Sequence, residues 1–156
     1  EEKIERLPGV STIADGIAVK EPGDLTYEIC KQYVDEIVTV SDSNLTDTQK
    51  RLEVAGIKEF FDVVVCYDMT GYKKPHHAPF ECALSLLECR AHDAVFVGDS
   101  IRRDIEPALA VGLTPVYAKY GDRNFFEEKY GLQIPAKTLV AEKPQDILTI
   151  LQTPML

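Results

Sequence analysis

The sequence predicts an α/β protein built on a doubly wound, Rossmann-like parallel sheet in a three-layer α/β/α arrangement. From Asp42 onward, helical patterns alternate with short apolar runs, and short connections join them. The 156 residues are enough for one domain, and a hydrophobic content of 45% supports a packed core. Residues 1–23 differ, because they lack clear periodicity and contain several glycines and prolines. We therefore expect a regular sheet preceded by an atypical N-terminal segment.

Apolar periodicity predicts the elements of the first half of the chain. Gly56 marks the end of one helix, since glycine readily adopts the left-handed backbone that follows a helix. A β-branched run before Cys66 is typical of a buried strand. The expected helices are 25–34, 46–55 and 77–88, and the expected strands are 36–40 and 61–66.

The same reasoning applies to the second half. Ala94–Val97 is a short apolar run that ends in Gly98-Asp99, and Gly112 closes the helical pattern that follows. Pro144 suits the first turn of the last helix. The expected helices are 101–111, 124–130 and 144–151, and the expected strands are 94–97, 114–118 and a short one near 139–140.

Composition restricts the kinds of partner. The formal charge of −9 argues against a general basic surface of the kind that binds nucleic acid or an anionic membrane. No apolar run approaches the length of a membrane span, and the charged first residues do not resemble a signal peptide. Four cysteines lie in apolar segments without C-x-x-C spacing, as expected of reduced core thiols. We therefore expect a cytoplasmic protein.

The Gly98-Asp99 turn is the most informative stretch. Asp99 stands at the carboxyl end of the expected strand, and Asp104 lies in the first turn of the next helix. Crowded carboxylates favour a cation between them, and hard oxygen ligands suit Mg²⁺. The alternative is a solvated loop in which Asp104 only stabilises the helix N-terminus. We favour a magnesium site.

Three segments in order resemble the haloacid dehalogenase superfamily of phosphohydrolases, over about residues 36–152. They are Ser43-Asn44-Leu45-Thr46-Asp47 after a strand, Lys74-Pro75 before a helix, and the segment Gly98–Asp104. The resemblance implies that Ser43 and Asn44 bind the phosphoryl group, that Lys74 neutralises its charge, and that Asp99 and Asp104 bind Mg²⁺. Taken separately, Ser43, Asn44 or Thr46 would cap a helix and Lys74 would be solvated.

The family's first motif, D-x-D-x-[ST] at the end of the central strand, is not found. The nearest candidate has Ile13 at the position of the nucleophilic Asp, and isoleucine cannot attack phosphorus. Asp15 would at most keep the role of the second Asp, the general acid/base. No insertion long enough for a cap domain separates the second and third segments, so we expect a capless core.

Residues 1–41 resemble an interior segment of threonine dehydratase, a pyridoxal-phosphate lyase. The stretch Thr12-Ile13-Ala14-Asp15-Gly16-Ile17-Ala18-Val19-Lys20 carries this resemblance. The lyase's Schiff-base lysine motif and glycine-rich phosphate loop are absent, so pyridoxal phosphate is not expected. We therefore interpret the chain as a chimera, with a dehydratase-like segment over 1–41 and a haloacid dehalogenase-like core over 42–156. Residues 12–19 are the candidate for the central strand.

The sequence thus predicts a Mg²⁺-dependent phosphohydrolase module for a small phosphorylated metabolite. Without its nucleophile, this module is expected to be inactive or very slow. The alternatives are a structural chimera with no enzymatic function, or a domain that binds phosphate and Mg²⁺. If the central strand is unfilled, unpaired sheet edges favour homo-oligomerisation.

Overall fold

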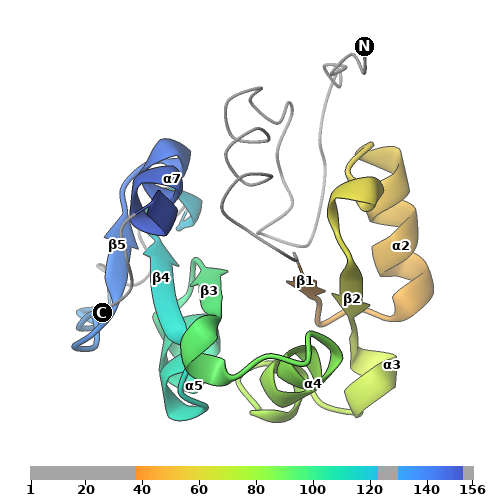
Figure 1. Cartoon of the computed structure of the whole chain (residues 1–156), viewed down its shortest axis with the longest axis horizontal. Helices are drawn as coiled ribbons and strands as arrows, with labels where there is room; N and C mark the ends of the chain where they lie inside the picture. The colour runs from red at the N-terminus through yellow and green to blue at the C-terminus, as the bar shows by residue number, and fades with distance from the viewer. Residues whose placement is uncertain (1–37, 123–129, 153–156) are drawn as a thin grey trace.

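The structure is a computed structural model that describes residues 38–122 and 130–152 (Figure 1). The expected helix 25–34, the start of strand 36–40, nearly all of helix 124–130 and the candidate central strand 12–19 lie outside these residues. The described part alternates strands with helices, and all of its strand pairs are parallel. This arrangement matches the predicted α/β class.

The first parallel pair joins β1 (Val38–Val40) to β2 (Val63–Val65), with Val38 opposite Val63. Helix α2 (Leu45–Val54) and the short helix η2 (Lys58–Phe60) connect the two strands. Asn44 caps α2, because its side chain accepts a hydrogen bond from the Asp47 N–H at 2.8 Å. Gly56 follows the last turn of α2 with a φ of 66°, as its position in the sequence predicts.

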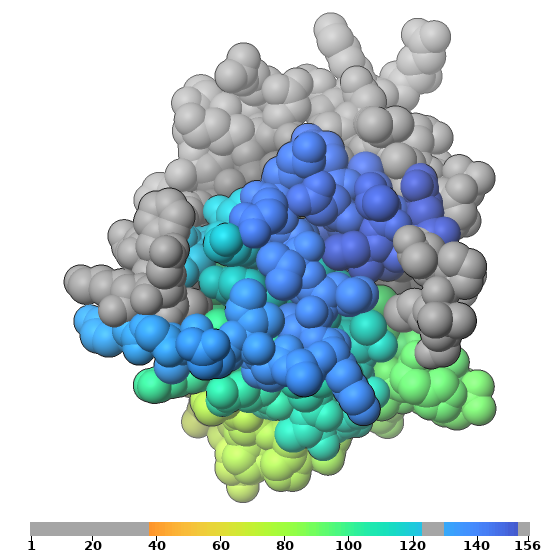
Figure 2. All heavy atoms as spheres, turned by 90° about the vertical axis from the view of Figure 1, so that its left-hand side faces the viewer, coloured from red at the N-terminus to blue at the C-terminus, as the bar shows by residue number. Residues whose placement is uncertain are grey.

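The second group of strands has the order β3-β4-β5, and its strands are β3 (Val95–Gly98), β4 (Thr114–Ala118) and β5 (Leu139–Ala141). Val97 lies opposite Val116, and Gly98 lies opposite Tyr117. The short helix η5 (Lys119–Gly121) follows β4, and α7 (Pro144–Gln152) follows β5. Residues 130–152 occupy the centre of the face drawn in Figure 2.

The expected helix 101–111 is not one continuous α-helix. It begins with the π-helical turn η4 (Ile101–Ile105) and continues as α5 (Glu106–Ala110). The Ile105 N–H bonds the Ser100 carbonyl at 3.1 Å, five residues back, which is the spacing of a π-helix. Pro107 has no N–H with which to bond the carbonyl four residues earlier, so the regular α pattern cannot form at this turn.

Four short helices of the described residues were not expected from the sequence. They are η2, α3 (Tyr67–Thr70), η3 (Ala91–Asp93) and η5, each of three or four residues. Such short turns carry too little periodicity to be recognised. The expected helix 77–88 is α4 (Ala78–Leu86), which has Pro79 in its first turn.

Within the described residues, the sheet is in two parts. β1 pairs with β2, β3 pairs with β4, and β1 does not pair with β3. The two parts flank α4 in Figure 1. Phe80 of α4 is 1% exposed and packs its ring on Phe96 of β3, with 4.9 Å between ring centroids. It belongs to a buried cluster with Ala108 and Leu113, so α4 is attached to the second part through apolar contacts.

No helix in the described ranges is both long and apolar enough to cross a membrane.

Replacing Phe80 by alanine is expected to lower the free energy of unfolding by about 3–5 kcal/mol, because it leaves a cavity between α4 and β3. Leu86→Ala on the same helix is the control, since Leu86 is 45% exposed. That variant should lose less than about 1 kcal/mol. Chemical denaturation of both variants measures the difference, and equal losses would contradict this account of the core.

Candidate functional site

The site lies at the carboxyl ends of β1 and β3. Asp42 and Ser43 follow β1 closely, and Asp99 follows β3 directly. The carboxyl ends of parallel strands in an open α/β sheet are the usual place for a ligand. At this edge, charged side chains also join the two parts of the described sheet.

A buried ion pair connects Lys74 to Asp104. The Lys74 ammonium lies 2.7 Å from Asp104 Oδ1, and the two side chains are only 15% and 5% exposed. The Ser100 N–H donates to the other carboxylate oxygen, Oδ2, at 3.2 Å. Asp104 is therefore held from two sides, and the structure brings together two of the residues that the sequence predicts for the site.

Asp42 extends this network toward β1. Its carboxylate accepts a hydrogen bond from the Lys74 N–H at 3.0 Å and forms an ion pair with Arg103 of η4. Sequence reasoning missed Asp42 and Arg103. The only available signal was the position of Asp42 just after an expected strand. Arg103 is next to Asp104 in sequence, yet nothing local indicates that it reaches across to β1.

Two glycines lie against the two predicted metal ligands. A Cβ atom on Gly98 would stand 2.4 Å from Asp104 Cβ, and one on Gly121 would stand 2.7 Å from Asp99 Cβ. Neither distance is possible without displacement of one of the groups. The backbone therefore approaches each carboxylate side chain more closely than any other residue would allow. Gly121 was not singled out by the sequence.

Ser43 and Asn44 occupy the loop between β1 and α2. The Ser43 hydroxyl accepts a hydrogen bond from Arg51 at 3.5 Å, and the Ser43 carbonyl accepts one from the Tyr67 N–H at 3.1 Å. The Asn44 side chain both caps α2 and donates to Asp47 Oδ2 at 2.9 Å. Helix capping, which the sequence left open as an alternative, is thus the role that the structure gives Asn44. Its part in phosphate binding stays a prediction.

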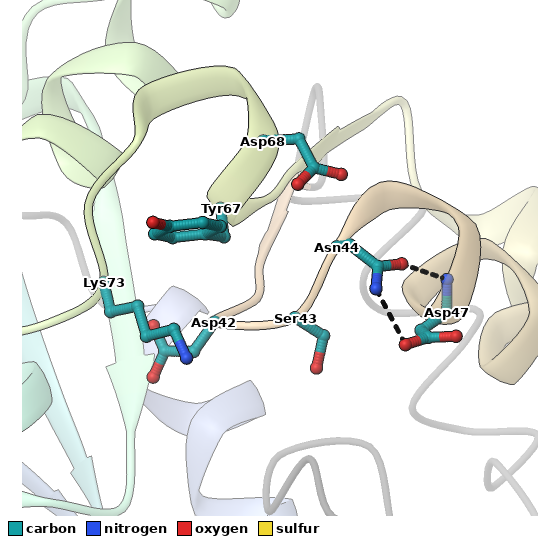
Figure 3. A pocket seen from close by; sticks show the side chains of 7 residues that line it. All are labelled: Asp42, Ser43, Asn44, Asp47, Tyr67, Asp68 and Lys73. Atoms are coloured by element: carbon teal, nitrogen blue, oxygen red, sulfur yellow. Dashed lines mark hydrogen bonds between the residues drawn. The ribbon is translucent and has the colours of Figure 1, made fainter.

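A polar cavity of about 510 Å³ opens beside this loop (Figure 3). Carboxylates from the β1 loop, α2 and α3 surround it, together with one ammonium group. Its lining residues are Asp42, Ser43, Asn44, Asp47, Tyr67, Asp68 and Lys73. Asp42 belongs both to this cavity and to the network around Lys74, so the cavity adjoins the ion pair.

Tyr120 of η5 lies near Asp99. Burial, and second the negative charge of Asp99, raise the pKa of the Tyr120 phenol above its ordinary value. The phenol therefore stays protonated at neutral pH. This places a neutral hydroxyl near the predicted metal ligand.

The donor chemistry at the end of β3 fits Mg²⁺. In residues 38–122 and 130–152, no cluster of three or more His, Cys, Asp or Glu side chains is arranged to hold a metal. Mg²⁺ is commonly bound by one or two carboxylates, with waters and substrate phosphate completing its shell. Asp99 and Asp104 supply donors of this type, and their role as metal ligands stays a prediction. Asp15, the candidate acid/base residue, lies outside the described part of the chain.

A parallel α/β sheet with acidic residues at its strand ends is typical of Rossmann-like α/β proteins, and comparison identifies the family. Residues 30–118 match the family described as haloacid dehalogenase-like hydrolase. This stretch is more than half of the chain, so the chain belongs to that family. The structure resembles a haloacid dehalogenase-type phosphatase from Thermococcus onnurineus with a TM-score of 0.67 and 24% identity. That likeness covers 85% of this chain and 58% of the other, and it confirms the fold.

Two curated relatives are phosphatases. The chain is 40% identical over 100 residues to a ribulose-1,5-bisphosphate 5-phosphatase from Halopiger xanaduensis, covering 63% of this chain and 41% of the relative. It is 35% identical over 82 residues to a glyceraldehyde 3-phosphate phosphatase from Pyrococcus abyssi, covering 53% and 34%. The chain thus spans less than half of either phosphatase.

A third relative belongs to a different class of enzyme. The chain is 56% identical over 45 residues to an L-threonine ammonia-lyase from Thermotoga maritima, which covers 29% of this chain and 11% of the lyase. This agrees with the resemblance to threonine dehydratase that the N-terminal segment shows. The chain is therefore similar to members of two unrelated enzyme families.

Replacing Lys74 by methionine is expected to lower the free energy of unfolding by about 3–5 kcal/mol, because it leaves the Asp104 carboxylate buried without its cation. Lys58→Met is the matched control. Lys58 pairs with Glu53 at the same 2.7 Å, but the two side chains are 48% and 56% exposed. Its loss should change stability by less than about 1 kcal/mol.

Urea unfolding of the two variants measures the contrast. The double variant Lys74→Met/Asp104→Asn should recover part of the loss, since the buried amide carries no charge. Similar losses for Lys74→Met and Lys58→Met would contradict the assignment of the Lys74–Asp104 pair as a buried one.

Proposed function

We propose that this chain is the phosphate- and Mg²⁺-binding part of a phosphohydrolase that acts on phosphate monoesters. The observation that carries the proposal is the buried Lys74–Asp104 pair at the carboxyl ends of the strands. The Lys74 N–H bonds Asp42, the neighbour of Ser43 in sequence, and Asp104 packs against Gly98, the neighbour of Asp99. A lysine held in a nearly buried position by a carboxylate is a preorganised cation, and such groups stabilise phosphoryl charge more strongly than solvated ones.

Each residue has a distinct role in this proposal. The Ser43 hydroxyl donates a hydrogen bond to a phosphoryl oxygen, and the Lys74 ammonium shares its charge between Asp104 and the phosphoryl group. Asp99 and Asp104 hold Mg²⁺, which when bound neutralises charge on the phosphoryl oxygens. Asp42 and Arg103 keep the Lys74 backbone and η4 at a constant separation, so that these groups face one ligand.

The substrate class follows from the relatives. Both phosphatases named above act on small phosphorylated sugars or trioses, as their names state. The polar cavity beside Ser43 suits a hydroxylated leaving group better than an apolar one, because its lining is mostly carboxylate and amide. We therefore propose a small phosphorylated metabolite as the ligand.

We further propose that turnover is absent or very slow in this chain. No D-x-D motif precedes Ser43, and the nearest candidate has isoleucine at the nucleophile position. Without a nucleophilic carboxylate, the covalent route through a phosphorylated enzyme is lost, and the remaining charged groups stabilise only bound phosphate.

The test is thermal unfolding of the chain with Mg²⁺ and inorganic phosphate together. Binding at ten times the dissociation constant should stabilise the folded state by about 1.4 kcal/mol, seen as a rise in the midpoint temperature. Asp99→Asn should abolish the rise. Asp93→Asn is the control, because Asp93 is an exposed residue paired with Arg90 at the surface. An unchanged midpoint in the original chain would overturn the proposal.

Hydrolysis of an aryl phosphate measures the second part of the proposal. We expect a rate several orders of magnitude below that of an intact phosphatase. A fast rate that Asp99→Ala abolishes would show that a nucleophile is present after all.

The second candidate is a structural chimera with no enzymatic function, and the lyase match favours it. That match covers only 11% of the lyase, too little for lyase activity. The division into segments 1–41 and 42–156 belongs to this candidate. No response of the midpoint to Mg²⁺ or phosphate would support it.

A further inference from the structure

Among the described glycines, tight contact is confined to the two that face the acidic residues. Hypothetical Cβ atoms on Gly56, Gly71 and Gly131 would meet nothing within 4 Å, and one on Gly112 would make an ordinary contact at 3.5 Å. A Cβ on Gly98 or Gly121 would lie within 3.0 Å of an aspartate side chain. At Gly98 and Gly121, the backbone thus comes closer to Asp104 and Asp99 than a residue with a side chain could.

Gly121 is distant from Asp99 in sequence, and the sheet brings them together. β3 and β4 are parallel, with Gly98 opposite Tyr117. Asp99 follows β3 directly, and η5 follows β4 directly, so both emerge at the same edge of the sheet. The contact of Gly121 with Asp99 is therefore a consequence of strand register.

The need for glycine at position 121 comes from close approach and not from backbone conformation. Gly121 does not have the positive φ that Gly56 and Gly112 have, so alanine fits its backbone without strain. The conflict would be with Asp99 itself, at 2.7 Å from Cβ, 3.4 Å from Cγ and 3.0 Å from Oδ2. Cβ is fixed to the backbone, so a rotation of the Asp99 side chain cannot relieve the closest contact.

The segment that carries Gly121 is anchored on its other side. Lys119 forms an ion pair with Glu142 beyond β5 at 2.9 Å, and the Asp122 N–H closes the turn on the Lys119 carbonyl at 3.2 Å. The backbone of η5 is therefore attached both to its own turn and to the neighbouring connection. This backbone lies along one side of Asp99, at Gly121.

We propose that Gly121 is a positioning residue that holds the Asp99 carboxylate in its metal-binding orientation. The inference rests on the proposed Mg²⁺ site and adds a residue to it. Gly121 contributes no donor atom; its backbone limits the orientations of Asp99, and an added methyl group displaces that side chain. Residues that orient a metal ligand typically change metal affinity by about 10–100-fold when they are replaced.

The experiment measures Mn²⁺ binding to the full chain by electron paramagnetic resonance, with Mn²⁺ as the probe for the Mg²⁺ site. Gly121→Ala should weaken binding at least ten-fold. Lys143→Ala is the control: it changes an exposed lysine of the connection after β5, keeps the Lys119–Glu142 ion pair and adds no atom against Asp99, so its affinity should stay within about two-fold. Equal affinities for Gly121→Ala and the original chain would overturn the proposal.

Failure of the proposed function gives a different result. If the original chain binds no Mn²⁺, the metal site itself is wrong, and the positioning role falls with it. If the original chain binds Mn²⁺ and Gly121→Ala binds it equally well, the metal site stands and only the role of Gly121 is wrong.

A second pair of variants covers the case in which Gly121→Ala does not fold. Asp99→Gly removes the side chain that the new methyl group would meet. The double variant Gly121→Ala/Asp99→Gly should then match the thermal midpoint of Asp99→Gly alone, because the two changes are coupled through one contact. A double variant that remains unfolded would show that Gly121 is needed for another reason, and it would overturn the proposal.

Discussion

The buried ion pair between Lys74 and Asp104 is the interaction on which the rest of the described structure depends. It joins the segment before α4 to the turn after β3, across a sheet whose described strands form two separate parallel groups. A buried charge pair contributes little net stability, but removing one partner is costly, so the pair specifies one arrangement of the two groups. The ion pair between Asp42 and Arg103 connects the loop after β1 to η4, nearer the surface. The groups proposed to bind phosphate and metal are thus also those that hold the site together.

The gap in strand pairing bears on catalysis as well as on folding. β1 and β3 carry Ser43 and Asp99 at their carboxyl ends, yet they pair only with β2 and β4 within the described residues. Residues 30–118 match the haloacid dehalogenase-like family and 45 residues of the chain match a lyase, and the division of the chain into parts of two enzymes stays a prediction. In the proposed function, side chains of the described part bind phosphate and a cation. The sequence contains no D-x-D-x-[ST] motif to supply the attacking carboxylate, and for that reason the proposal separates binding from turnover.

Much of the local structure could be predicted from the sequence, because its causes are local. Strand 114–118 is β4 with the same bounds, and Gly56 follows its helix in the left-handed conformation, as predicted. Prediction was wrong where a neighbour changed a regular pattern. Pro107 removes one N–H and leaves a π-helical turn where a continuous helix was expected. The candidate site was predicted only in part. Residue types and their order pointed to Lys74, Asp99 and Asp104, whereas Asp42 had only its position after a strand as a signal, and Arg103 and Gly121 carry no local signal.

The sequence by itself determined the α/β class, the family resemblance and the acidic turn after β3, since each depends on residue types at short spacings. Only the tertiary structure decided which groups meet. Lys74 reaches a carboxylate 30 positions away, and Gly121 touches Asp99 because β3 and β4 are adjacent and in register. Contacts of this kind depend on strand order and on the close packing of backbone against side chain. Both are properties of the folded chain as a whole, because a segment read alone does not specify its neighbour in the sheet.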